Sequence, residues 1–72
     1  MTNPYENLAN AVIVLAAKDY RKVLRRLQRF PHDKDSLRER DSLERFFRSA
    51  WFGVLTKADP ETLMKKLRLE VM

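Results

Sequence analysis

Apolar residues recur at steps of three and four along the N-terminal part of the chain, which places them on one face of an α-helix. We expect this helix to run from about Pro4 to Arg29. The apolar stripe comprises Tyr5, Ala9, Val12, Ala16, Tyr20, Val23 and Leu27. Four further residues widen it: Leu8, Ile13, Leu15 and Leu24. Val14 falls on the opposite side, so the first half of the predicted helix is apolar nearly all round. That half is either the centre of the bundle or part of a contact surface.

Capping residues followed by proline mark the starts of two predicted helices. Asn3 stands before Pro4, and Asp59 stands before Pro60. Proline suits the first helical position because its missing N–H would have no partner there. The start of a helix between these two is less sharply marked. Its candidate caps are Asp33, Asp35 and Ser36.

A second apolar segment with helical spacing follows in the middle of the chain. It comprises Leu43, Phe46, Phe47, Ala50, Trp51, Val54 and Leu55. This helix is either continuous or interrupted at Ser49, which would then cap a short separate turn. Gly53 weakens a continuous helix, because glycine costs about 1 kcal/mol relative to alanine there. Acid-first pairs at the i,i+4 spacing, Asp41 with Arg45 and Glu44 with Arg48, favour helix in this segment.

The last predicted helix runs from about Pro60 to Glu70, and no stretch alternates as a strand would. The prediction is therefore an all-α fold, a small three-helix bundle forming a single domain over residues 1–72. Its middle helix is either unbroken or broken near Ser49–Gly53.

Composition limits the chemistry that the chain can perform. It has no cysteine, one histidine and one glycine, which excludes thiolate metal ligands and glycine-rich phosphate loops. His32 stands alone in a turn, and Asp33 and Asp35 lack the glycine and final glutamate of a calcium loop. We expect no catalytic residues, no cofactor, no metal site and no enzymatic activity.

No segment of the sequence predicts a membrane helix. The longest apolar run, Ala11–Ala17, has seven residues, whereas a spanning helix needs about 20. Ahead of it only Glu6 is charged, so the basic region of a secretory signal is missing. We expect a cytoplasmic protein without a membrane partner.

The net charge of +5 comes from one short region, because residues 18–29 hold six basic residues against Asp19. Five of the six share one helix face, opposite the apolar stripe: Lys18, Arg21, Lys22, Arg25 and Arg29. Such a face can follow a phosphate backbone, dock onto an acidic protein surface, or be merely solvated.

Aromatic residues gather just after the middle of the chain, in residues 46–52. Phe47 and Trp51 are four apart, share a helix face and are expected in the core. Phe52 is exposed if the helix is continuous, and turned inward if Ser49 breaks it. Exposed aromatic residues are frequent hot spots of protein contacts, so Trp51 and Phe52 are the candidate protein contacts.

Residues 44–56, ERFFRSAWFGVLT, resemble a short motif in small uncharacterised proteins encoded by phages and prophages of Firmicutes. The resemblance extends upstream through residues 14–22. Ala50 stands where an acidic residue is common in that group, and Asp59-Pro60-Glu61 replaces a turn containing glycine. The resemblance implies a mobile genetic element, whose short proteins often bind host machinery, and it brings no established activity.

These observations together predict a non-catalytic helical module that binds a host protein and modulates or inhibits it. The target would be a nuclease or a defence component such as the CRISPR machinery. One alternative is a nucleic-acid-binding accessory or regulatory protein that uses the basic face. Another is a structural homo-oligomer that pairs through the apolar turns Ala11–Ala17.

Overall fold

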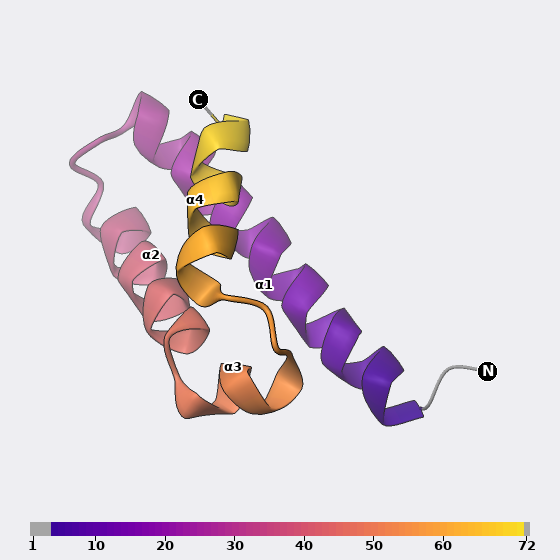
Figure 1. The fold of residues 1–72 in the computed structure, drawn as a ribbon. Helices are drawn as coiled ribbons and strands as arrows, with labels where there is room; N and C mark the ends of the chain where they lie inside the picture. Colours follow the sequence, from indigo (N-terminus) through magenta and orange to yellow (C-terminus); the bar gives the residue numbers. More distant parts are fainter. Residues whose placement is uncertain (1–3, 72) are drawn as a thin grey trace.

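The structure, a computed structural model, describes residues 4–71, with side chains from Asn7 onward, and all regular structure in this range is helical (Figure 1). The helices are α1 (Pro4–Arg29), α2 (Lys34–Phe47), α3 (Ala50–Leu55) and α4 (Pro60–Val71). The all-α prediction is confirmed, as are the bounds of α1. The middle helix is divided at Ser49 into α2 and α3, which is the second of the two alternatives that the sequence left open, so the described residues form four helices.

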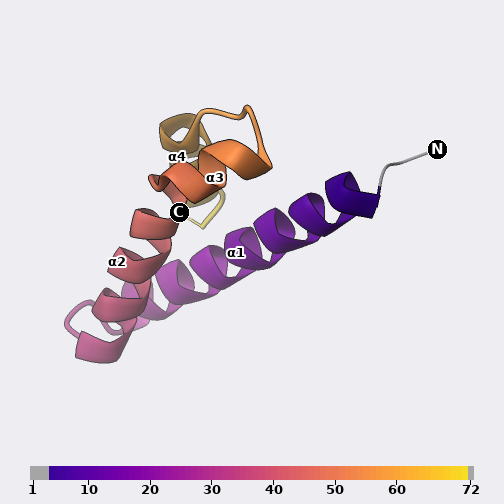
Figure 2. The same ribbon diagram turned by 90° about the horizontal axis from the view of Figure 1, so that it is seen from below.

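Helix α1 is the platform on which the other three helices pack, since each of them contacts it. Figure 2 shows α3 and α4 on one side of α1, while α2 crosses near its C-terminal end. The N-terminal turns of α1 extend beyond the other helices, so the molecule is elongated, measuring 43 × 21 × 18 Å (Figures 1 and 2). One long face of α1 therefore has no neighbouring helix.

The core lies where the helices meet and is rich in aromatic rings. Tyr20 of α1, Phe47 of α2 and Phe52 of α3 are buried together with Met64 and Leu67 of α4. The ring centroids of Tyr20 and Phe47 are 5.5 Å apart, as are those of Phe47 and Phe52, both in edge-to-face geometry. Edge-to-face pairs add to the free energy gained by burial. All four helices thus contribute to one core.

The caps of α2 and α4 follow the capping chemistry expected from the sequence. Asp33 is the residue that caps α2, because its carboxylate accepts hydrogen bonds from the backbone N–H and the hydroxyl of Ser36. Asp59 accepts from the N–H of Thr62 at 3.2 Å and from its hydroxyl at 2.6 Å, and α4 begins at Pro60 as predicted. The cap expected at Asn3 lies outside the described residues.

The chain breaks between α2 and α3 because Ser49 caps a new helix. Its backbone is extended, with φ −76° and ψ 156°, and its hydroxyl accepts from the N–H of Phe52 at 3.3 Å. The same hydroxyl donates to the carbonyl of Phe46 at 2.6 Å, which also closes the end of α2. Gly53 lies inside α3, so serine rather than glycine sets the break.

The break at Ser49 decides where two neighbouring aromatic residues lie: Phe52 turns inward, as expected for a broken helix, and the expectation for Trp51 is wrong. Trp51, expected in the core, is 61% exposed, whereas Phe52, named as a candidate protein contact, is only 1% exposed. Restarting the helix at Ser49 turns the direction of α3, which brings Phe52 against Phe47 and leaves Trp51 outside. Phe52 is therefore a core residue that a partner cannot reach in this structure, and Trp51 remains a candidate contact.

Replacing Ser49 with alanine should lower the free energy of unfolding by about 1 kcal/mol, because the first turn of α3 loses its cap. Urea denaturation measures the change. Ser42→Ala is the matched control, since Ser42 is exposed inside α2 and alanine is a better helix former there. Equal effects of the two substitutions would contradict a capping role for Ser49.

Candidate binding surface

The face of α1 that lacks a neighbouring helix presents a single row of exposed side chains. Its members are three or four positions apart, so they follow one another along one side of the helix. We call this row the outer face of α1. It consists of Leu8, Ala11, Leu15, Lys18, Lys22, Arg25 and Arg29. Its first half is apolar and its second half is basic.

The basic half holds four of the five cations that the sequence placed on one face. Lys18, Lys22, Arg25 and Arg29 are exposed, and within the part of the chain that the structure describes none forms an ion pair. Six of the other eleven basic residues pair with carboxylates, namely Arg21, Arg26, Arg38, Arg40, Arg48 and Arg68. The basic half therefore carries positive charge that nothing described in this protein neutralises.

Arg21, the fifth predicted contact, differs from the others because it is engaged within the molecule. Its side chain is half-buried, and its Nε donates to Oε2 of Glu70 at 2.6 Å. This contact joins α1 to α4. Arg21 lies at the edge of the outer face and is less available to a partner than Lys22 or Arg25.

The apolar half lies on the surface and not at the centre of the bundle. Leu8 is 65% exposed and Leu15 is 60% exposed, so the expectation that they widen the buried stripe is wrong. The reason is tertiary: the packed helices cover only one side of α1, and its N-terminal turns project beyond them. Val14, which flanks the row, is exposed as well.

A shallow hollow marks the junction of the apolar and basic halves. It has a volume of about 560 Å³. Its lining residues are Leu15, Lys18, Asp19, Arg21, Lys22 and Arg25. Asp19 is the one carboxylate among them, so the hollow is mainly basic with an apolar end. A side chain of a partner can insert here between the two halves.

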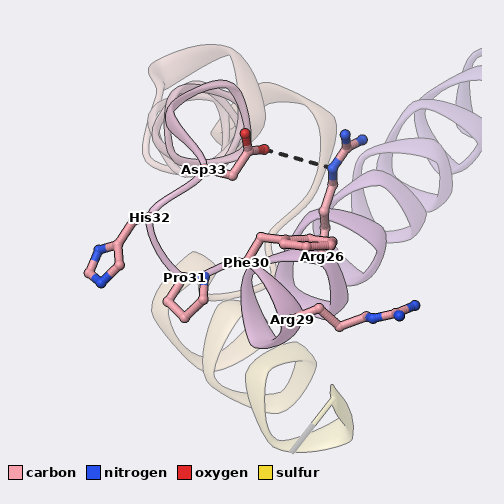
Figure 3. Close-up of a pocket in the computed structure, with 6 residues that line it drawn as sticks. All are labelled: Arg26, Arg29, Phe30, Pro31, His32 and Asp33. Carbon is pink, nitrogen blue, oxygen red and sulfur yellow. Dashed lines mark ion pairs between the residues drawn. The ribbon is translucent and has the colours of Figure 1, made fainter.

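A second concave region lies at the corner between α1 and α2 (Figure 3). It encloses about 540 Å³ and is lined by Arg26, Arg29, Phe30, Pro31, His32 and Asp33. The Arg26 Nε lies 3.7 Å from the Asp33 carboxylate, and the Arg29 guanidinium lies 5.9 Å from the centre of the exposed Phe30 ring. The imidazole of His32 points away from both arginines (Figure 3). This corner continues the basic half with an exposed aromatic ring.

A polar cluster next to the core joins α1, α2 and α4. The Tyr20 hydroxyl donates to Oε2 of Glu44 at 2.8 Å, and Glu44 lies 3.7 Å from Arg48 and 3.9 Å from Arg68. Burial raises the pKa of Tyr20 from 10.0 to about 12, and the hydrogen bond to Glu44 adds to the rise. The sequence indicated only the pairing of Glu44 with Arg48, because the other contacts join distant segments. This cluster holds the three helices together.

The other predicted pair of the middle helix differs from expectation. Asp41 pairs with its neighbour Arg40, at 3.2 Å between Oδ1 and the guanidinium. Arg48 pairs with two carboxylates. One is that of Glu44, and the other is that of Glu61, whose Oε1 accepts from the Arg48 Nε at 2.7 Å. The hydrogen bond from Arg48 lowers the pKa of Glu61 below its usual value. The pair of Arg48 and Glu61 links the end of α2 to the first turn of α4, whereas Asp41 and Arg40 both lie within α2.

Within residues 4–71 no three carboxylate or imidazole side chains gather as a metal site would require. None of the described helices is both long enough and apolar enough to cross a bilayer. Comparisons with protein-family models, with curated proteins and with solved structures give no match. The structure itself defines an all-helical protein with one exposed helix face that is apolar at one end and basic at the other.

Proposed function

We propose that this protein is a non-catalytic binding module that docks onto another protein through the outer face of α1. The observation that carries the proposal is the succession, on one exposed helix face, of an apolar half and a basic half whose cations form no ion pair within residues 4–71. Burying Leu8 and Leu15 is favourable only against an apolar surface, whereas Lys22 and Arg25 require an anionic one. A protein surface offers both kinds of group side by side.

The exposed state of the apolar half gives this argument its energetic basis. Fully burying an exposed leucine side chain contributes about 1.5–3 kcal/mol of favourable free energy. Leu8 and Leu15 are each more than half exposed, so binding can still gain most of this free energy. Aromatic residues and arginine often dominate protein interfaces. Trp51 on α3 is therefore a second candidate contact, separate from the outer face.

A nucleic-acid-binding function is the second candidate, and the four unpaired cations of the basic half favour it. They extend over residues 18–29, about 16 Å along the helix, and phosphates would neutralise them. A phosphate backbone would leave Leu8 and Leu15 in water, however. This is why the protein partner is the stronger proposal.

The proposed target is a host protein, which binding would modulate or inhibit. The resemblance of residues 44–56 to phage and prophage proteins supports this choice, with a nuclease or another defence component as the class of target. Homo-oligomer formation through Ala11–Ala17 has less support, because Ala16 and Ala17 of that segment are buried in the core.

Site-specific crosslinking tests the proposed docking face. A photoreactive amino acid replaces Leu15 in one variant and Ser42, exposed on α2, in the control variant. In a nuclease-treated bacterial lysate, we expect one discrete protein adduct from position 15 and none from position 42. Adding Lys22→Glu and Arg25→Glu should reduce the adduct at position 15 about tenfold or more, because like charges then oppose the partner.

Three outcomes of this experiment would contradict the proposal. They are an adduct that disappears on nuclease treatment, the same adducts from both positions, and no adduct from position 15. The first would favour the nucleic-acid function instead. Circular dichroism of each variant checks that the helices are intact.

A further inference from the structure

We infer that the outer face of α1 receives an α-helix of the partner whose own contact row is apolar at one end and acidic at the other. This inference rests on the proposed function and specifies the chemistry of the partner. It follows from the shape of the outer face, the order of its groups and the failure of a second copy to match it.

The shape of the outer face fits a helix. It is a row of side chains from Leu8 to Arg29, about 32 Å long at 1.5 Å per residue. Rows of side chains at steps of three and four on one helix pack between the corresponding rows of another. The hollow that extends from Leu15 to Arg25 lies along this row and can receive one side chain of such a partner.

The order of groups along the outer face determines which end of the partner's contact row is apolar and which end is acidic. Leu8, Ala11 and Leu15 require apolar residues opposite them, and these occupy one end of the contact row. Lys22 and Arg25, which form no ion pair within residues 4–71, require carboxylates at the other end. Complementary charges of this kind set the register and orientation of two docked surfaces.

A second copy of this chain cannot satisfy the outer face. In an antiparallel pair of α1 helices, the basic half of each copy would lie against the apolar half of the other, which leaves cations buried without partners. In a parallel pair, Lys22 and Arg25 would face the same cations of the other copy. Charge complementarity therefore points to a different protein.

A displayed library of helical peptides tests the inference directly. The peptides have about 21 residues, the length of the outer face, and are randomised along one helix row. Selection on the purified full-length protein should enrich aspartate and glutamate at one end of the row and leucine or isoleucine at the other. Selection on the Lys22→Glu/Arg25→Glu variant should instead enrich lysine and arginine at the end of the row where the natural protein selects aspartate and glutamate.

Binding measurements on the enriched peptides complete the test. The double variant should bind an acidic peptide about tenfold or more weakly, and replacing the carboxylates of that peptide with lysines should restore its affinity. Lys65→Glu/Lys66→Glu is the matched control. It makes the same change in net charge at exposed positions of α4 and should leave binding unchanged.

The inference is overturned if selection enriches no peptides, if the enriched peptides lack acidic residues, or if both double variants weaken binding equally. Tighter binding of duplex DNA than of every selected peptide, at the same ionic strength, would also overturn it. A protein adduct from position 15 together with non-acidic peptides would leave the proposed function standing and remove only this description of the partner.

Discussion

Replacing Phe52 with alanine should lower the free energy of unfolding by about 3–4 kcal/mol, enough to unfold much of a protein of this size. Phe52 is 1% exposed and its ring contacts those of Phe46 and Phe47 edge-to-face. Alanine would leave a cavity where three helices meet. Thermal and urea denaturation, followed by circular dichroism, measure the loss.

The adjacent residue provides the control for this prediction. Trp51→Ala removes a larger side chain that is 61% exposed, so it should change the free energy of unfolding by less than about 1 kcal/mol. Phe52→Leu retains most of the volume and should cost about 1–1.5 kcal/mol. A loss for Trp51→Ala as large as that for Phe52→Ala would show that α3 packs in a different orientation.

Stability should decline at high pH in the natural sequence and decline less in Tyr20→Phe. The pKa of Tyr20 rises from 10.0 in the unfolded chain to about 12 in the folded protein, chiefly because the hydroxyl is buried. The folded state therefore holds this proton more tightly. Its contribution to stability is complete below pH 10 and is lost as the pH rises through about 12.

The comparison with phenylalanine isolates this one group from the titration of lysines. At pH 7 the natural protein should be more stable than Tyr20→Phe by about 1 kcal/mol, because the hydrogen bond to Glu44 is present. Urea midpoints measured between pH 7 and pH 12 should show this difference narrowing above pH 10. A constant difference over the whole range would mean that the Tyr20 hydroxyl is accessible to water in the folded state.

The extent of α1 and the start of α4 could be predicted from the sequence because their causes are local. Proline at Pro4 and Pro60, and the apolar spacing between Tyr20 and Leu27, act within one or two turns. The sequence left two alternatives for the middle helix, a continuous helix and one interrupted at Ser49. The local free energies of a helix broken at a serine cap and of a continuous helix differ by little. The burial of Phe52 against Phe47 and Tyr20 favours the broken form, and these contacts are tertiary.

The basic half of the candidate site could be predicted from the sequence, but the exposure of its apolar half could not. The spacing of Lys18, Lys22 and Arg25 places them opposite the core whatever the neighbouring helices do. The exposure of Leu8 and Leu15 depends on how far α2, α3 and α4 reach along α1, which no local pattern records. The pairing of Arg21 with Glu70 likewise depends on where α4 lies.

The packing of α4 on α1 also affects how the chain folds during its synthesis. The apolar stripe of α1 is translated first, but Met64 and Leu67, which share its core, follow about 40 residues later. At translation rates of about 5–20 residues per second, roughly 2–8 s pass between the synthesis of that stripe and the synthesis of the α4 residues that pack on it. The native core around Tyr20 and Val23 can therefore close only after α4 has been synthesised.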